Sequence, residues 1–221
     1  MVEHVRRRVA LCEHIDEVIV ATPDHEIRTV VESLGGRVVM TSNAHERASD
    51  RVAEVAGKTT ADILVMVQGD EPLITPEMVS LSLGPFRDPT VQCVNLTREI
   101  TTSEELLNPN VIKIVRDTQG NALFFSRQPI PTGALVRPGV RAWKQVCVIP
   151  FRRDAVLRFA ALEPTHGEKA ESVDMLRFLE HGIAVHLVES QHDSMAVDAP
   201  ADVAAVEALL AVDSLMSRYS S

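Results

Sequence analysis

The feature that most constrains the fold is a continuous apolar segment at residues 61–67, followed directly by a turn that contains Gly69 and Asp70. The segment reads ADILVMV, so its apolar residues do not alternate with polar ones, as they would in a strand with one wet face. Runs of this kind are typical of a central parallel strand that is covered on both faces. We therefore predict a buried parallel strand here, with helices on both sides of its sheet.

Segments with helical spacing and short apolar runs alternate along the first part of the chain. The pattern predicts a helix at 2–13, a strand at 16–22, a helix at 24–34, a strand at 37–40 and a helix at 49–57. Asp24 is the expected N-cap of the second helix, and Gly35 with Gly36 is expected to end it. This order indicates an α/β fold with a doubly wound, mixed sheet, and such sheets bind ligands beyond the carboxyl ends of their strands.

The pattern changes to strands with short turns in the second half of the chain. We predict strands at 91–97, 111–115, 122–126 and 145–151, then a helix at 168–180, a strand at 183–188 and a helix at 200–215. The strand-rich part is interpreted as a small antiparallel extension of the sheet. Because 221 residues suit one α/β unit, residues 1–221 are expected to form a single domain.

Charge and cysteine usage exclude several classes of protein. The chain has 22 lysines and arginines against 31 acidic residues, a net charge of -9, so we expect no nucleic-acid partner. Its three cysteines are widely separated, which predicts neither a disulfide framework nor a zinc site and favours the cytoplasm. No apolar run reaches membrane-spanning length, so we expect no membrane partner.

Two aspartates follow apolar stretches at predicted strand ends. Asp70 comes after Gly69, which permits a tight turn and a close ligand, and a carboxylate there is placed to hold Mg²⁺ against a phosphate. The alternative makes Asp70 a helix cap or turn former, and the spacing does not decide between the two. Asp198 precedes Pro200 at the start of a predicted helix, where the local pattern favours simple N-capping.

Four segments occur in the order found in one enzyme family. They are VQGDEP at 67–72, NPNVIK at 108–113, ALFFSR at 122–127 and VDAP at 197–200. On these segments the chain resembles the 3-deoxy-manno-octulosonate cytidylyltransferases. The resemblance implies a glycosyltransferase-A-like nucleotidyltransferase fold, CTP and a sugar acid as substrates, Mg²⁺ as cofactor, a homodimer, and a role in making lipopolysaccharide.

The resemblance also implies the site residues. Asp70 and Asp198 match the family's metal-binding aspartates and are therefore the expected catalytic and metal-ligating pair. The expected substrate-binding residues are His45, Ser49, Asp50, Arg51, Gln68, Arg127, Gln145 and Glu171. Local ion pairs on a solvated helix are the alternative for Asp50 and Arg51, and a surface position is the alternative for Arg127. Glu168, Glu171 and Asp174 recur every three residues, which predicts one acidic helical face, either lining the sugar site or simply solvated.

The chain departs from the family pattern in the sugar-binding segments. Relatives carry Lys-His-x-Gly-x-Tyr where this chain has KQVCVI at 144–149, and Leu-Glu-Gln-Leu-Arg where it has VDMLR at 173–177. Lost hydrogen-bonding partners in such a pocket change substrate selection strongly. The expected product is a CMP-activated 3-deoxy-2-ulosonic acid plus pyrophosphate. A different sugar acid and a non-catalytic nucleotide-binding subunit both remain open.

Relatives also begin with a strand and a loop patterned Pro-Ala-Arg-x-x-Ser-x-Arg-Leu-Pro-Gly-Lys, which binds phosphates and has no match here. The hypothesis is that the sequence is N-terminally truncated, because removal of that strand would expose the edges of its neighbours. Translation of the DNA upstream of Met1 should then reveal an in-frame strand and arginine-rich loop. An in-frame stop codon immediately upstream would contradict this hypothesis.

Overall fold

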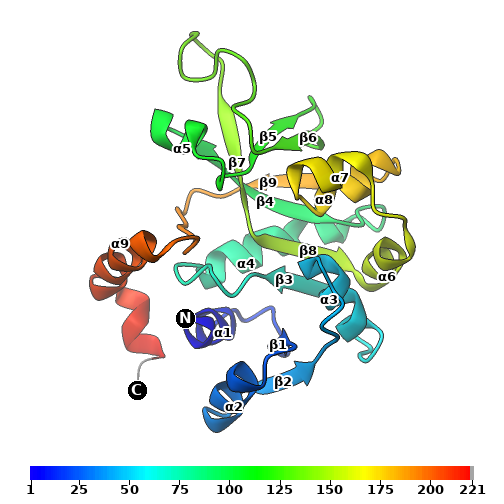
Figure 1. The fold of residues 1–221 in the computed structure, drawn as a ribbon, viewed down its shortest axis with the longest axis vertical. Coiled ribbons are helices and arrows are strands. Elements are labelled where there is room, and N and C mark those ends of the chain that lie inside the picture. Colours follow the sequence, from blue (N-terminus) through cyan, green and yellow to red (C-terminus); the bar gives the residue numbers. More distant parts are fainter. Residues whose placement is uncertain (220–221) are drawn as a thin grey trace.

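The computed structural model describes residues 1–219 and shows an α/β fold with helices on both faces of a mixed sheet (Figure 1). The strands are β1 (Ile19–Thr22), β2 (Arg37–Met40), β3 (Ile63–Val67), β4 (Val94–Ile100), β5 (Lys113–Arg116), β6 (Ala122–Ser126), β7 (Ala142–Val146), β8 (Val148–Arg152) and β9 (His186–Glu189). The helices are α1 (Val2–Val9), α2 (His25–Ser33), α3 (Ala48–Ala56), α4 (Pro76–Leu83), α5 (Ser103–Leu107), α6 (Arg153–Ala161), α7 (His166–Glu171), α8 (Met175–Glu180) and α9 (Pro200–Ala211).

The strands form three hydrogen-bonded groups. β1 pairs in parallel with β2, β3 pairs antiparallel with β8, and the largest sheet has the order β6-β5-β7-β4-β9. An isolated bridge between Cys93 and Phe151 joins β8 to the start of β4, so the second and third groups are adjacent. The antiparallel pairing of β4 through β7 confirms the expected extension, while β4 and β9 run in parallel.

The sequence predicted the first half well because its local signals agree with its packing. Asp24 caps α2 as expected, since its carboxylate accepts hydrogen bonds from the backbone N–H groups of Glu26 (2.7 Å) and Ile27 (3.2 Å). Gly35 adopts a φ of 75° just beyond the helix, a conformation that glycine reaches without strain.

Helix α4, helix α5 and helix α6 were not predicted, and α1 ends at Val9 rather than at residue 13.

Strand β3 is covered on both faces, as its apolar run indicates. Met66 packs into a core cluster with residues of α3, α6 and α8, whereas Val65 and Val67 pack against a second cluster built from α1 and α4. The expected parallel pairing of β3 is wrong, because its partner is β8 in antiparallel register, from Ile63 opposite Arg152 to Val67 opposite Val148. Burial on both faces explains the apolar pattern of β3, and that pattern does not depend on whether the neighbouring strand is parallel or antiparallel.

The expected single strand at 145–151 is wrong, because the chain breaks at Cys147 into β7 and β8. β7 belongs to the large sheet and β8 pairs with β3. At the break, the Cys147 N–H donates to the Glu71 carboxylate (3.4 Å) and the Cys147 carbonyl accepts from the Gln68 N–H (3.3 Å). The turn after β3 is therefore tied directly to the point where the chain passes from one sheet to the other.

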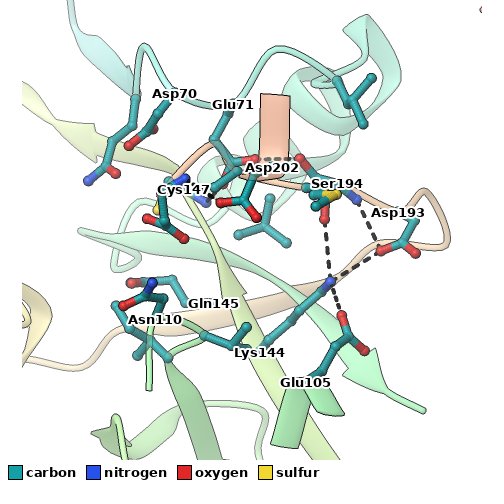
Figure 2. A pocket seen from close by; sticks show the side chains of 18 of the residues that line it. Asp70, Glu71, Glu105, Asn110, Lys144, Gln145, Cys147, Asp193, Ser194 and Asp202 are labelled. Atoms are coloured by element: carbon teal, nitrogen blue, oxygen red, sulfur yellow. Dashed lines mark hydrogen bonds and ion pairs between the residues drawn. The ribbon is translucent and has the colours of Figure 1, made fainter. Parts of the chain in front are cut away.

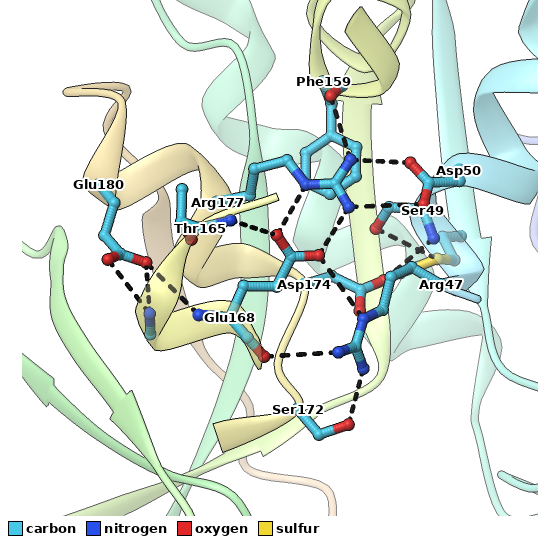
Figure 3. A network of polar contacts seen from close by, with 12 residues as sticks. Arg47, Ser49, Asp50, Phe159, Thr165, Glu168, Ser172, Asp174, Arg177 and Glu180 are labelled. Carbon is cyan, nitrogen blue, oxygen red and sulfur yellow. Dashed lines mark hydrogen bonds and ion pairs between the residues drawn. The ribbon is translucent and has the colours of Figure 1, made fainter. Parts of the chain in front are cut away.

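The expected single helix at 168–180 is also wrong. It divides into α7 and α8 around Ser172, which has a left-handed φ of 55°. The division lets the Arg177 guanidinium turn inward, where it pairs with Glu168 (2.6 Å) and Asp50 (2.9 Å) and lies 4.1 Å above the Phe159 ring (Figure 3). Arg177 is only 3 % exposed, so this network joins α3 to α7 and α8 in a dry environment.

The last helix, α9, ends at Ala211 rather than at residue 215 and lies to one side of the sheet, connected to β9 by residues 190–199 (Figure 1). Within the described range, none of the helices is both long and apolar enough to cross a bilayer.

Substitution of Arg177 tests the buried network. Arg177→Met should lower the free energy of unfolding by about 3–5 kcal/mol, because Asp50 would lose its ion-pair partner and the buried Glu168 would keep only the longer contact with Arg47 (3.5 Å). Urea denaturation monitored by circular dichroism measures this change. Lys58→Met, which removes the exposed pair Lys58–Glu54, is the matched control and should leave stability unchanged. Equal effects of the two variants would contradict a structural role for the network.

Candidate active site

A cavity of about 840 Å³ opens at the carboxyl ends of β3 and β7 (Figure 2). Its wall comes from the turn after β3, from the β7–β8 junction, from residues 172–175 and from the connection between β9 and α9. These segments are far apart in the sequence and converge only in the fold. The position agrees with the rule that α/β sheets bind ligands beyond the carboxyl ends of their strands.

Asp70 lies in this wall, and one oxygen of its carboxylate is left without a partner in the described part of the chain. Its Oδ1 atom is buried and has no hydrogen-bond partner among residues 1–219. The following helix, α4, is capped instead by Thr75, whose hydroxyl accepts from the Met78 N–H (3.2 Å). Asp70 is therefore not a helix cap, although it does lie in the turn after β3, as the turn-former alternative expected.

Asp198 lies in the same cavity wall and is likewise not a cap. The carboxylate that caps α9 is that of Asp202, which accepts from the backbone N–H groups of Ala199 (2.7 Å) and Asp198 (3.0 Å). The sequence favoured N-capping by Asp198, and the structure assigns that task to the aspartate four residues later. Both aspartates of the expected pair thus keep their carboxylates available to a ligand.

Burial and nearby negative charge raise the pKa values of both carboxylates. Burial raises the pKa of Asp70, and the nearby charge of Asp198 raises it further. Burial also raises the pKa of Asp198, with a further contribution from Asp202. The positive charge of Arg127 only partly offsets the raised pKa of Asp198, and a divalent metal ion held by both carboxylates would relieve the remaining repulsion. No group of three or more metal-ligating His, Cys, Asp or Glu side chains is found within residues 1–219. Magnesium needs only one or two carboxylates together with phosphate oxygens and water.

Three further residues of the expected set line the cavity: Gln68, Arg127 and Gln145. The Arg127 guanidinium donates to the backbone carbonyls of Glu171 (2.8 Å), Pro109 (3.0 Å) and Ser172 (3.4 Å). Glu171 does not line the cavity. Its carboxylate accepts from the Ser126 hydroxyl (3.0 Å) and the Arg127 N–H (2.8 Å), so it fixes the backbone that carries Arg127.

The remaining four expected residues lie outside the cavity lining. His45 pairs with Glu54 (2.6 Å), Arg51 donates to the Thr41 hydroxyl (2.5 Å), and Asp50 belongs to the Arg177 network. Ser49 is fully buried. The Ser49 N–H, however, donates to the carboxylate of Asp174 (3.0 Å), so this segment supports a cavity residue from behind. A direct pocket role for the four residues stays a prediction.

The structure places two further acidic residues in the cavity wall, Asp174, which the sequence left between the sugar site and solvent, and Glu71, which it did not assign. Asp174 lines the cavity, and burial raises its pKa. The expected acidic face of Glu168, Glu171 and Asp174 does not exist, because α7 ends before Asp174 and Glu168 is buried against Arg177. Glu71 is 4 % exposed and also lines the cavity. Its place in the VQGDEP segment was the available signal, although spacing cannot show which way its side chain points.

Comparison with solved structures places this fold among the nucleotidyltransferases. A 4-diphosphocytidyl-2C-methyl-D-erythritol synthase from Anaerococcus prevotii superposes with a TM-score of 0.61 at 16% identity, covering 95% of this chain and 88% of the other, which shows the fold alone. A CMP:2-keto-3-deoxy-manno-octonic acid synthetase complexed with CTP superposes with a TM-score of 0.87 at 36% identity, covering 95% and 87%.

Sequence comparison identifies the family. The cytidylyltransferase family model matches residues 1–190. A 3-deoxy-manno-octulosonate cytidylyltransferase from Geotalea uraniireducens is 42% identical over 92% of this chain and 85% of its own length. The same enzyme from Myxococcus xanthus is 43% identical over 95% and 85%. The chain belongs to the cytidylyltransferase family, among the 3-deoxy-manno-octulosonate cytidylyltransferases.

The unmet charge at Asp70 leads to a stability prediction. Asp70→Asn should raise the melting temperature of the metal-free protein at pH 7, because it removes a negative charge that burial and the nearby Asp198 make unfavourable. The pKa of Asp70 is raised in the folded state, so folding favours the protonated form. The advantage of the variant should shrink as the pH falls through that raised pKa and vanish below the unfolded value of about 3.9.

Thermal melts in EDTA across pH measure this difference. Asp16→Asn, at an exposed site, is the control and should have no such effect. A variant that is less stable than wild type at pH 7, with the deficit constant across pH, would contradict the electrostatic account.

Proposed function

We propose that the chain transfers a cytidylyl group from CTP to a 3-deoxy-2-ulosonic sugar acid, 3-deoxy-manno-octulosonate or a relative, and releases pyrophosphate. The observation that carries the proposal is the partly buried Asp70 carboxylate, whose Oδ1 has no hydrogen-bond partner among residues 1–219 and which lies close to Asp198 in the wall of a large cavity. In the reaction, the anomeric hydroxyl of the sugar bonds to the α-phosphorus of CTP as the bond from that phosphorus to the pyrophosphate oxygen breaks.

Asp70 and Asp198 are the residues that would hold Mg²⁺. The bound ion would supply charge neutralisation at the phosphates and would acidify the attacking hydroxyl. The two carboxylates come from separate segments that meet at the end of β3, so together they would define where the ion is held. Transfer of this kind depends on in-line positioning and electrostatic stabilisation, which a rigid wall of fixed groups provides.

The sugar acid would lie against Gln145, Asp174 and Arg127, which line the same cavity. Asp174 is held by the Ser49 N–H and Arg127 by three backbone carbonyls, so neither group must be ordered when substrate arrives. The Gln145 side-chain amide donates through Nε2 to the Asn95 side chain (2.5 Å), which leaves its amide oxygen as an acceptor.

A related sugar acid is the second candidate substrate. Cys147, Ile149 and Met175 line the cavity at positions where the family pattern has Gly, Tyr and Gln. At Ile149 and Met175 an apolar side chain replaces the hydrogen-bonding Tyr and Gln of the pattern, so a substrate with a hydroxyl at that wall would lose partners. The homodimer, the cytoplasmic location and the role in lipopolysaccharide synthesis are further proposals that rest on the family resemblance.

The metal assignment is tested by Asp70→Ala. In protein produced with any upstream residues that its gene encodes, this variant should lose turnover of CTP by at least about a hundredfold, because charge neutralisation contributes several kcal/mol. The assay is magnesium-dependent pyrophosphate release, with circular dichroism to show that the fold is retained. Activity within a few-fold of wild type would rule out Asp70 as the metal ligand.

A panel of sugar acids separates the substrate candidates. If the apolar wall faces the sugar, kcat/KM should be higher for an acid that lacks a hydroxyl at that wall than for 3-deoxy-manno-octulosonate. Met175→Gln should reduce this preference by restoring a polar partner. Equal kcat/KM values for all acids in both proteins would exclude a selective role for the wall. Absence of turnover with every acid would favour the non-catalytic alternative.

A further inference from the structure

The connection between β9 and α9 carries Asp198 into the cavity without being a strand or a helix itself. A carboxylate on such a segment is useful to a metal only if the segment is fixed. One fixing contact is direct: the Val197 N–H donates to the carbonyl oxygen of Asp70 (2.9 Å). This bond lies one residue before Asp198 and ends on Asp70, the residue whose pKa the charge of Asp198 raises.

A second contact starts from Glu71, the neighbour of Asp70. The Glu71 carboxylate turns away from that of Asp70 and accepts hydrogen bonds from the Ser194 hydroxyl and from the Cys147 N–H. A buried carboxylate needs such bonds, because burial without them would be strongly unfavourable. The two adjacent carboxylates therefore differ in their hydrogen bonding. Within residues 1–219, Asp70 has no partner at Oδ1, whereas Glu71 is bonded to Ser194 in the connection between β9 and α9.

A third contact comes from Lys144 on β7. Its ammonium group donates to Glu105 (2.5 Å), to Asp193 (3.2 Å) and to the Ser194 carbonyl (3.3 Å), as Figure 2 shows. An ammonium group has three hydrogens, so all of its donors are used within the protein. Lys144 is 8 % exposed, and α5 supplies Glu105 on its far side. The lysine thus anchors the connection to the large sheet.

We propose that Glu71 and Lys144 are positioning residues, which hold residues 193–198 against the turn after β3 and thereby set Asp198 beside Asp70. The inference rests on the proposed metal pair and adds the contacts that hold its two aspartates next to each other. Neither residue needs to touch metal or substrate. The arrangement is a polar clasp, formed by Glu71, Lys144, Asp193 and Ser194, that joins two strand ends through the segment carrying the second ligand.

Variants of the clasp test this inference through metal binding in the absence of substrate. Mn²⁺ binding, measured by electron paramagnetic resonance, should weaken by about 10- to 100-fold in Lys144→Met and in Ser194→Ala, because supporting residues of metal ligands have effects of this size. Lys144→Arg keeps the charge and the donors and should recover most of the affinity. Lys58→Met, which removes an exposed lysine, is the matched control and should bind Mn²⁺ like wild type.

Hydrogen exchange supplies a second readout that does not depend on the metal. Amides of residues 193–198 should exchange faster in Lys144→Met and Ser194→Ala, while those of β3 and β7 remain protected. Wild-type exchange in both variants would overturn the clasp. Unchanged Mn²⁺ affinity, with KM for CTP or the sugar acid raised instead, would also overturn it by making Lys144 a substrate-binding residue. If wild type binds no Mn²⁺, the proposed metal pair fails, and the exchange data alone decide whether the clasp exists.

Discussion

The interaction on which the rest of the structure depends most is the incompletely compensated repulsion between the carboxylates of Asp70 and Asp198 at the end of β3. Asp70 is desolvated, lacks a hydrogen bond at Oδ1 and feels the negative charge of Asp198. A fold gains nothing from such a pair unless something else neutralises it, and strain of this kind is concentrated at functional sites. The acids come from distant parts of the sequence, so the fold brings them together at a cost to its own stability.

The surrounding architecture keeps that pair in place. β3 is packed on both faces by apolar clusters, which makes the turn after it a firm base for Asp70. The break at Cys147 lets one continuous stretch of chain serve two sheets and line the cavity between them. On the far wall, the Arg177 network fixes α7 and α8 and so determines where Asp174 faces the cavity. Rigid supports of this kind suit a reaction that depends on positioning.

Local sequence signals predicted those parts of the fold whose cause is local. The apolar run at 61–67 predicted a strand covered on both faces, and Asp24 predicted the start of α2, because each signal reports the contacts that its own residues make. The break at Cys147 gave no signal, since Val146, Val148 and Ile149 continue the apolar pattern through it. The division between α7 and α8 depends on Arg177 reaching Asp50, a contact between residues 127 positions apart.

The site shows the same limit. The family resemblance selected Asp70 and Asp198, but spacing could not decide between capping and ligand roles, because Asp198 just before α9 and Asp202 in its first turn are both suitably placed to cap it. The partners of Lys144 come from α5 and from the connection after β9, so only the fold assembles them.

A crystal structure with Mn²⁺ and CTP, measured at a wavelength where manganese scatters anomalously, tests the central claim most directly. If Asp70 and Asp198 hold the metal, one anomalous peak should lie within coordination distance of both carboxylates and of a phosphate oxygen of CTP. A peak elsewhere in the cavity, with Asp70 still unbound, would contradict it.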